Sequence, residues 1–199
     1  TAPLGIGKRL IASGIPEFRD QYPEIEVRLR LSDHEVDMMR EGIDVAFKLG
    51  ILENSSFRMR GIMDCERVLA AAPDYLKRRG EPKTPEALID ERHDCLMLRF
   101  PGAREHFWML QTPEGARKFE VGGPFDSDDG DVITDWALAG RGIVNKPRFE
   151  IEPFLRDGRL QVVLPETPPV PVKLAALYPH KKFQDPKVRL LVDFMAGRC

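Results

Sequence analysis

The sequence lacks features that mark whole classes of protein. Its 199 residues contain only three cysteines, an odd number at wide spacing that favours neither a disulfide framework nor a cysteine-based metal site. No apolar run reaches the roughly 18 residues of a transmembrane helix, and the first residues lack the basic-then-apolar layout of a signal peptide. We therefore expect a cytoplasmic protein with no membrane partner.

An excess of one charge is also missing. The 30 Lys and Arg residues are balanced by 32 Asp and Glu residues, for a formal net charge of −2. A free-standing DNA- or RNA-binding domain usually carries a basic patch, so this segment is not expected to touch nucleic acid itself. A hydrophobic fraction of 42% is ordinary for a globular protein, and the length allows one large core or two smaller ones.

The cysteines themselves give little evidence of chemistry. Cys65, Cys95 and Cys199 are expected to be reduced thiols, with Cys65 and Cys95 partly buried. A redox pair between Cys65 and Cys95 is the less favoured alternative, because cytosolic disulfides are rare.

No motif for catalysis, phosphate binding or metal binding is complete. There is no G-x-S-x-G elbow, and "GIGKRL" (5–10) lacks the first Gly and the Ser or Thr of a phosphate-binding loop. "DSDDGD" (126–131) lacks the closing Glu of an EF-hand and is better interpreted as an acidic helix cap. One further group of possible ligands has no metal-binding spacing: Glu91, His93, Asp94, Cys95 and His106. We expect no catalytic residue, metal or cofactor.

Helix and strand patterns alternate near the start. From Gly7 to Tyr22 apolar residues recur every three to four positions, which predicts an amphipathic helix. Residues 24–31, "EIEVRLRL", alternate apolar and charged, which predicts a half-exposed strand at a sheet edge. A helix capped by Ser32 or Asp33 should follow and end at Gly42. "IDVAF" (43–47) then predicts a buried strand, which completes a strand–helix–strand unit of a parallel sheet.

Helix and strand patterns also alternate in the remaining chain, except in its middle part, which has the pattern of β-hairpins. Between Cys95 and Phe125 short apolar runs are separated by turns such as Pro101-Gly102 and Thr112-Pro113-Glu114-Gly115, as in β-hairpins. Helices are expected at 74–80, 85–90, 131–140, 149–158 and from about 186, and extended segments at 59–72, 142–147, 159–164 and 174–179. Two groups of strand–helix units around a hairpin-rich middle predict two α/β lobes.

Junctions between loops and helices are the remaining candidates for a binding site. Those at Pro3-Leu4-Gly5, Ser32-Asp33 and Ser127-Asp128 leave helix N-terminal amides, which favour an anion. In an open α/β sheet ligands bind beyond the carboxyl ends of the strands, where these junctions and Lys48-Leu49-Gly50 fall. A small carboxylate is the natural ligand of such a site.

Five stretches in order resemble the effector-binding domain of LysR-type transcriptional regulators. The match covers nearly the whole chain and is loosest between Arg99 and Asp131. The stretches are "IPEFRDQYPEIEVRLRLSDHEVDMMREGIDVAFKLGILENSSFRMRGI", "RVLAAAPDYLKRRGEPKTPEALIDERHDCL", "WALAGRGIV", "FLRDGRLQVVLPE" and "ALYPHKKFQDPKVRLLVDFM".

This resemblance implies a fold like that of type 2 periplasmic binding proteins: α/β, with two Rossmann-like lobes whose mixed sheets are joined by two crossing strands. Lobe I would comprise residues 1–72 and 174–199 and lobe II residues 73–173. The crossing strands would lie near Ala70–Pro73 and Val170–Leu174. A small effector would bind between the lobes.

The resemblance also implies partners. The effector would be an organic acid, an amino acid or an aromatic acid, and its binding would control the geometry of an oligomer on DNA. The homodimer would form through residues 7–22 and 25–31, and a tetramer is an option for the full-length protein. The winged helix-turn-helix that binds DNA, and the first strand of the lobe I sheet, would precede Thr1.

The junctions and the resemblance together give one set of candidate effector-binding residues: Pro3, Leu4, Gly5, Ser32, Lys48, Leu49, Gly50, Ser127, Asp128, Lys146 and Pro147. Three acidic residues, Asp126, Asp128 and Asp129, stand where the family commonly has neutral ones, which favours an amine or amino acid over a simple anion. Two alternatives share the scaffold: a stand-alone solute-binding protein of a transporter, and an enzyme, for which we find no catalytic pair.

Overall fold

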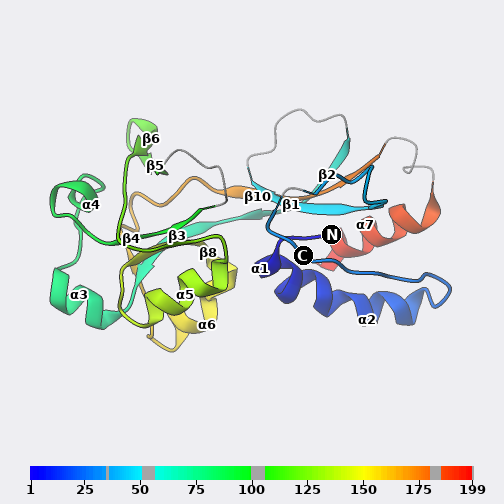
Figure 1. Cartoon of the computed structure of the whole chain (residues 1–199), viewed down its shortest axis with the longest axis horizontal. Helices are drawn as coiled ribbons and strands as arrows, with labels where there is room; N and C mark the ends of the chain where they lie inside the picture. The colour runs from blue at the N-terminus through cyan, green and yellow to red at the C-terminus, as the bar shows by residue number, and fades with distance from the viewer. Residues whose placement is uncertain (35, 51–56, 100–105, 180–184, 199) are drawn as a thin grey trace. The chain divides into compact units, whose positions relative to one another are not determined.

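The computed structural model describes residues 1–34, 36–50, 57–99, 106–179 and 185–198. The chain forms two compact units, which we call unit 1 (Thr1–Cys65 and Val172–Cys199) and unit 2 (Glu66–Pro171) (Figure 1). The first division lies earlier than the expected lobe boundary after residue 72, because β3 (Arg67–Ala71) pairs entirely with strands of unit 2. The expected segment 59–72 is therefore two strands, one in each unit.

The helices of unit 1 pack against each other. They are α1 (Leu4–Ile6), the π-helical turn η1 (Gly7–Ile11), α2 (Ala12–Gln21) and α7 (Pro186–Arg198). The first three form one continuous segment, so the predicted first helix is confirmed and begins slightly earlier. The rings of Phe18 and Phe194, whose centroids lie 5.4 Å apart, join α2 to α7. Gly7 permits close packing here, because a Cβ would lie 2.2 Å from Cδ2 of Leu31.

The sheet of unit 1 has the order β1-β10-β2 and is antiparallel. Its strands are β1 (Ala46–Gly50), β2 (Arg58–Cys65) and β10 (Val172–Tyr178). Thr1 extends the hydrogen bonding beyond β1: its amino group donates to the carbonyl of Val45 (2.7 Å), and its carbonyl accepts from Phe47 (2.8 Å). Ala2 in turn forms a parallel bridge with Leu31.

Two expectations for unit 1 are wrong. Residues 24–31 form no ladder strand: Leu31 makes one bridge, and the residues before it are extended without strand pairing. The predicted helix after Ser32 is a single turn at residues 38–42. The carboxylate of Asp37 caps this turn by accepting from the next amides, and Gly42, at φ 67°, ends it.

Unit 2 contains a five-stranded mixed sheet of order β7-β4-β8-β3-β9. Strand β4 is parallel to both of its neighbours, and β3 is antiparallel to both of its own. Besides β3, the strands are β4 (Cys95–Leu98), β7 (Asp126–Ser127), β8 (Ile143–Pro147) and β9 (Gln161–Val163). The predicted hairpin is confirmed as β5 (Trp108–Thr112) paired with β6 (Gly115–Phe119).

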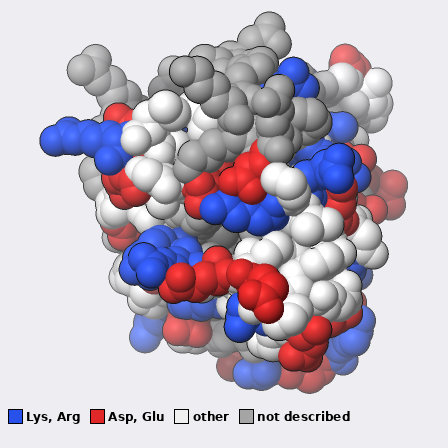
Figure 2. All heavy atoms as spheres, turned by 90° about the vertical axis from the view of Figure 1, so that its right-hand side faces the viewer, with Lys and Arg blue, Asp and Glu red and all other residues white. Residues whose placement is uncertain are grey.

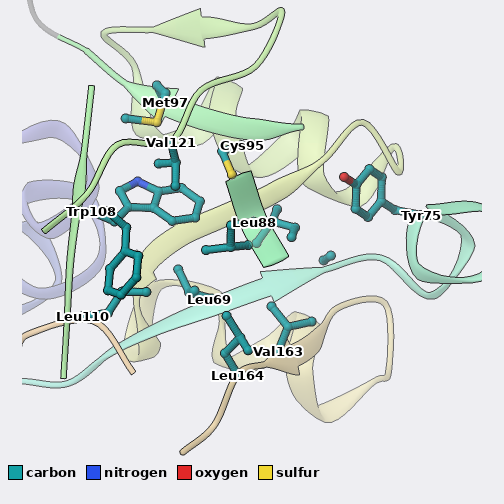
Figure 3. Close-up of a cluster of buried hydrophobic side chains, with 13 residues drawn as sticks. Leu69, Tyr75, Leu88, Cys95, Met97, Trp108, Leu110, Val121, Val163 and Leu164 are labelled. Carbon is teal, nitrogen blue, oxygen red and sulfur yellow. The ribbon is translucent and has the colours of Figure 1, made fainter. Parts of the chain in front are cut away.

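The helices of unit 2 agree with the predicted positions. They are α3 (Pro73–Arg79), α4 (Ala87–Asp90), α5 (Gly130–Leu138) and α6 (Arg148–Arg156). Hydrophobic side chains pack on both faces of the sheet, since successive residues of β3 belong to different clusters: Leu69 to one, Val68 and Ala70 to the other. Figure 3 shows the Leu69 cluster.

The cysteines fit a structural role. Cys65 and Cys95 are buried thiols, and neither is part of a disulfide among the described residues. Burial raises the pKa of the Cys95 thiol to about 12, which keeps it protonated near neutral pH. Cys199 and the expected turn at Pro101-Gly102 lie outside the described residues.

Candidate functional site

The candidate residues of unit 1 lie at one edge of the unit. Residues 1–2 hydrogen-bond to residues 30–32 on one side and to residues 45–47 on the other. The chain segments that follow residues 1–2, 30–32 and 45–47 therefore begin side by side, as the parallel arrangement predicts. These segments carry the unit 1 candidates Pro3, Leu4, Gly5, Ser32, Lys48, Leu49 and Gly50.

The amide at the start of the first helix already has an anionic partner. The carboxylate of Asp33 accepts a hydrogen bond from the Leu4 amide at 2.8 Å. Beside it, the Ser32 hydroxyl accepts from the amide of His34 at 3.1 Å. The chain thus supplies its own carboxylate at the position where we expected a ligand anion.

Lys48 to Gly50 form the end of β1. Lys48 is exposed and pairs with Ala175 of β10, and Gly50 pairs with Lys173. A Cβ on Gly50 would meet no atom of the described residues within 4 Å. This open space is compatible with the choice of Gly50 as a candidate.

At the Ser127-Asp128 junction of unit 2, a carboxylate of the chain also accepts the amides at the start of a helix. Ser127 ends β7, and its hydroxyl accepts from the Asp129 amide at 3.1 Å. The carboxylate of Asp129 accepts from the amides of Asp131 (2.7 Å) and Val132 (3.3 Å) at the start of α5. The interpretation of "DSDDGD" as an acidic helix cap is confirmed. Of the two candidate residues at this junction, Ser127 and Asp128, Asp128 is exposed.

Lys146 is a buried charge and not an exposed contact. Its side chain is 4% exposed and forms an ion pair with Glu150, whose side chain is 6% exposed. Its ammonium also donates to the carbonyl of Gly130, in the first turn of α5, at 3.2 Å. Lys146 therefore ties the start of α6 to the start of α5, directly beside the Ser127-Asp128 junction. Pro147, the last residue of β8, is also buried.

A second cation lies near this pair. Burial lowers the pKa of Arg67, and the negative charge of Glu150 acts in the opposite direction. The cluster of Arg67, Lys146 and Glu150 thus carries two positive charges and one negative charge when all three groups are ionised. Its position at the end of β8 makes it the main buried electrostatic feature near the unit 2 candidates.

Sequence reasoning missed two functional neighbours. Asp33 was considered as a cap of its own helix, whereas it caps a helix 29 residues earlier in the chain, and no local pattern indicates that contact. Glu150 was not singled out, because a spacing of four residues indicates an ion pair within one helix, whereas Lys146 lies in β8 and Glu150 in α6.

The described residues meet neither the requirements of a metal site nor those of a membrane span. Among them, no group of three or more His, Cys, Asp or Glu side chains is placed to hold a metal ion. None of the helices in the described ranges is long and apolar enough to cross a membrane.

Two α/β units, each with candidate binding residues where strands end and helices begin, define a small-molecule-binding domain of the type 2 periplasmic-binding-protein class. The chain belongs to the LysR substrate binding domain family, whose model matches residues 1–199. The family predicted from the sequence and its fold class are both confirmed.

Similar proteins are regulators. The chain is 30% identical over 196 residues to the HTH-type transcriptional activator TtdR of Escherichia coli K12, and the match covers 98% of this chain but 62% of that protein. The chain resembles the full-length structure of the Vibrio cholerae virulence activator AphB (30% identity, TM-score 0.81, 98% of this chain and 66% of that chain). It also resembles the regulatory domain of CrgA from Neisseria meningitidis (25% identity, TM-score 0.84, 98% and 95%).

These similarities support the regulator among the alternatives that the sequence left open. TtdR, AphB and CrgA are all named as transcriptional regulators or activators, and none of the three is named as an enzyme. None of these matches supports a stand-alone solute-binding protein of a transporter. The chain spans less than two thirds of the length of TtdR.

Proposed function

We propose that this chain is the effector-sensing part of a LysR-type transcriptional regulator, and that it binds a small metabolite. Effector binding stabilises one conformation of the chain over another and so changes the oligomer presented to DNA. DNA is contacted by an N-terminal winged helix-turn-helix in the longer protein, and homodimers form through residues 7–22 and 25–31.

The observation that carries this proposal is the family match over residues 1–199. The geometry within each unit is compatible with it. In unit 1, the candidate segments begin side by side after residues 2, 31 and 47. In unit 2, Ser127 and Asp128 lie beside the start of α5, which Lys146 holds in place.

The electrostatics favour an effector that is not a simple anion. Carboxylates of the chain already accept the amides of Leu4 and of Asp131, and Asp128 adds an exposed negative charge. An amino group on the ligand would be attracted by these charges, whereas the carboxylate of the same ligand would be attracted by Lys48 and by the Arg67–Lys146 cluster. We therefore favour an amino acid within the broader class of small organic acids.

A thermal-shift screen with matched ligand pairs tests this function. Each amino acid is compared with the acid of the same skeleton that lacks the amino group, such as phenylalanine with 3-phenylpropionate and glutamate with glutarate. A ligand at about 100 times its Kd stabilises the folded state by about 2.7 kcal/mol, which corresponds to roughly 5 °C or more in Tm for a domain of this size. Stabilisation by amino acids alone supports the ligand class.

Two variants make the screen specific. Lys48→Ala removes an exposed side chain at the unit 1 edge and should reduce the ligand-induced shift. Lys77→Ala, an exposed lysine on α3, is the matched control and should not change it. If no carboxylate, amino acid or aromatic acid stabilises the chain, the sensing function itself is contradicted.

A further inference from the structure

A polar side chain inside the unit 2 sheet lacks the hydrogen bonds that such groups usually make. Asn145 in β8 is 7% exposed, and its Oδ1 atom is buried without a hydrogen-bond partner among the described residues. On the face of the molecule shown in Figure 2, by contrast, charged side chains of both signs are interspersed at the surface, where water and neighbouring charges compensate them. A buried oxygen without a partner costs free energy, so Oδ1 of Asn145 needs a physical explanation.

The guanidinium of Arg67, at the start of β3, is a second group with unused hydrogen-bonding capacity. It makes no hydrogen bond and no close ion pair with any residue that the structure describes. Burial lowers the pKa of Arg67, and the negative charge of Glu150 only partly counteracts this effect. The carboxylate of Glu150 instead contacts the ammonium of Lys146. The planar guanidinium has five N–H donors in a geometry that suits a carboxylate.

The strand register brings these two side chains to one face of the sheet. Asn145 pairs with Leu69 of β3, and Arg67 lies two residues before Leu69. Residues paired across an antiparallel ladder, and residues two apart in one strand, leave a sheet on the same face. Asn145 and Arg67 are therefore diagonal neighbours, with Cβ atoms about 7–8 Å apart. A buried acceptor and a set of available donors thus lie within reach of one small polar group.

The position of this pair in the sheet is typical of a ligand site. Strands β4 and β8 are parallel, and Asn145 lies two residues before the carboxyl end of β8. In open α/β sheets, ligands bind beyond the carboxyl ends of the strands. The same face carries the hydrophobic cluster of Figure 3, which includes Leu69 and Met97. Apolar side chains with a few polar groups at one end are the usual composition of a small-molecule site.

We propose that Arg67 and Asn145 recognise the head group of an amino acid: the Arg67 guanidinium donates to the ligand carboxylate, and Oδ1 of Asn145 accepts from the ligand amino group. This inference rests on the function proposed above and assigns the selectivity for an amino group to Asn145. A ligand with a carboxylate alone would pair with Arg67 but leave Oδ1 without a partner. A site of this kind discriminates strongly against an analogue that lacks the donor.

The stability of the unliganded chain gives the first measurement. Asn145→Leu keeps the branching of the side chain at Cγ and removes the unpartnered oxygen, so it should leave Tm unchanged or raise it. Thr134→Val is the matched control, because Thr134 is 4% exposed and its hydroxyl donates to the carbonyl of Gly130 at 2.9 Å. This control should lower Tm by roughly 2–4 °C. An equal fall for Asn145→Leu would overturn the proposal, because Oδ1 would then have a partner in the unliganded chain.

Ligand selectivity is the deciding measurement. Calorimetry gives Kd for each amino acid and for the same skeleton without the amino group, beginning with phenylalanine and 3-phenylpropionate and with glutamate and glutarate. Asn145→Leu should reduce the preference for the amino acid by about tenfold or more. Asn145→Asp, which keeps an acceptor oxygen, should preserve or increase that preference. Arg67→Met should weaken both members of a pair by a similar factor, because both carry the carboxylate.

The outcomes separate this inference from the sensing function on which it rests. If neither an amino acid nor its counterpart binds the unaltered chain, the sensing function is contradicted, and this inference with it. If an amino acid binds and Asn145→Leu keeps the full preference, the sensing function stands and this inference is overturned, since water alone then satisfies Oδ1. Equal loss of the preference in Asn145→Leu and Asn145→Asp also overturns it, because the acceptor oxygen would not be the cause.

Discussion

The buried ion pair of unit 2 allows a quantitative prediction. Lys146 and Glu150 are 4% and 6% exposed, so both charges have lost most of their hydration, and each depends on the other for compensation. Glu150→Leu leaves the Lys146 ammonium buried with the Gly130 carbonyl as its remaining partner among those described. We expect this variant to lower the free energy of unfolding by about 3–5 kcal/mol, the usual cost of breaking one partner from a buried pair.

The double variant Lys146→Met with Glu150→Leu should recover part of that loss but not all of it, because Arg67 still loses the negative charge of Glu150. It replaces two buried charges with apolar side chains of similar volume, a change that is often neutral or stabilising. With the second single variant, Lys146→Met, a double-mutant cycle gives the coupling energy of the pair. Urea unfolding followed by tryptophan fluorescence is suited to the measurement, because Trp108 and Trp136 both lie in unit 2.

A second ion pair on α6 provides the control. Arg156 and Glu152 are also four residues apart, but their side chains are 78% and 27% exposed. Arg156→Ala should change the free energy of unfolding by only about 0.3–0.5 kcal/mol. If Glu150→Leu costs no more than this control, or if the double variant is as unstable as the single one, the argument from burial is refuted.

Three further predictions concern other buried groups of unit 2. Because burial raises the pKa of Cys95 to about 12, iodoacetamide at pH 8 should alkylate this thiol only after unfolding, as measured by mass spectrometry. The contribution of the protonated Cys95 thiol to stability is complete below the unfolded pKa near 9.0 and is lost as pH rises toward 12. Gly123→Ala would place a Cβ 2.7 Å from the Cys95 carbonyl and should lower Tm, whereas Gly122→Ala meets nothing within 4 Å and should not; equal melting curves would contradict this. Tyr75→Phe removes the hydroxyl 3.2 Å from the buried His93 ring and should lower the urea-derived free energy of unfolding by about 1–3 kcal/mol.

Local signals predicted most of unit 2. The hairpin turn, the cap by Asp129 and the ends of α3 and α5 each depend on residues within one or two turns of the chain. Such contacts can be recognised from spacing, because the residues that form them are close in sequence. The burial of Lys146 was not recognised, because it depends on packing between β8, α5 and α6, which sequence spacing does not reveal.

Unit 1 departed from prediction where distant partners decide the structure. The alternation in 24–31 correctly indicates which side chains are half-buried, but a ladder needs a neighbour, and only Ala2 provides one among the described residues. The helix expected after Asp33 fails because the carboxylate of Asp33 accepts from Leu4 instead, and Asp37 caps a single turn. Several candidate caps in one short segment cannot be ranked from sequence alone.

The self-supplied caps have a consequence for any effector that carries a carboxylate. Asp33 and Asp129 are tethered next to the amides that they accept, so their effective concentration at those amides is far higher than that of a free metabolite. A ligand carboxylate would have to displace a hydrogen bond that the protein already has, and it would gain little from the exchange. An amino group competes with neither hydrogen bond and is attracted by the same carboxylates. Discrimination between an amino acid and its deaminated analogue therefore follows from the capping geometry itself, and Asp129→Ser, which keeps a helix cap but removes the charge, should weaken it.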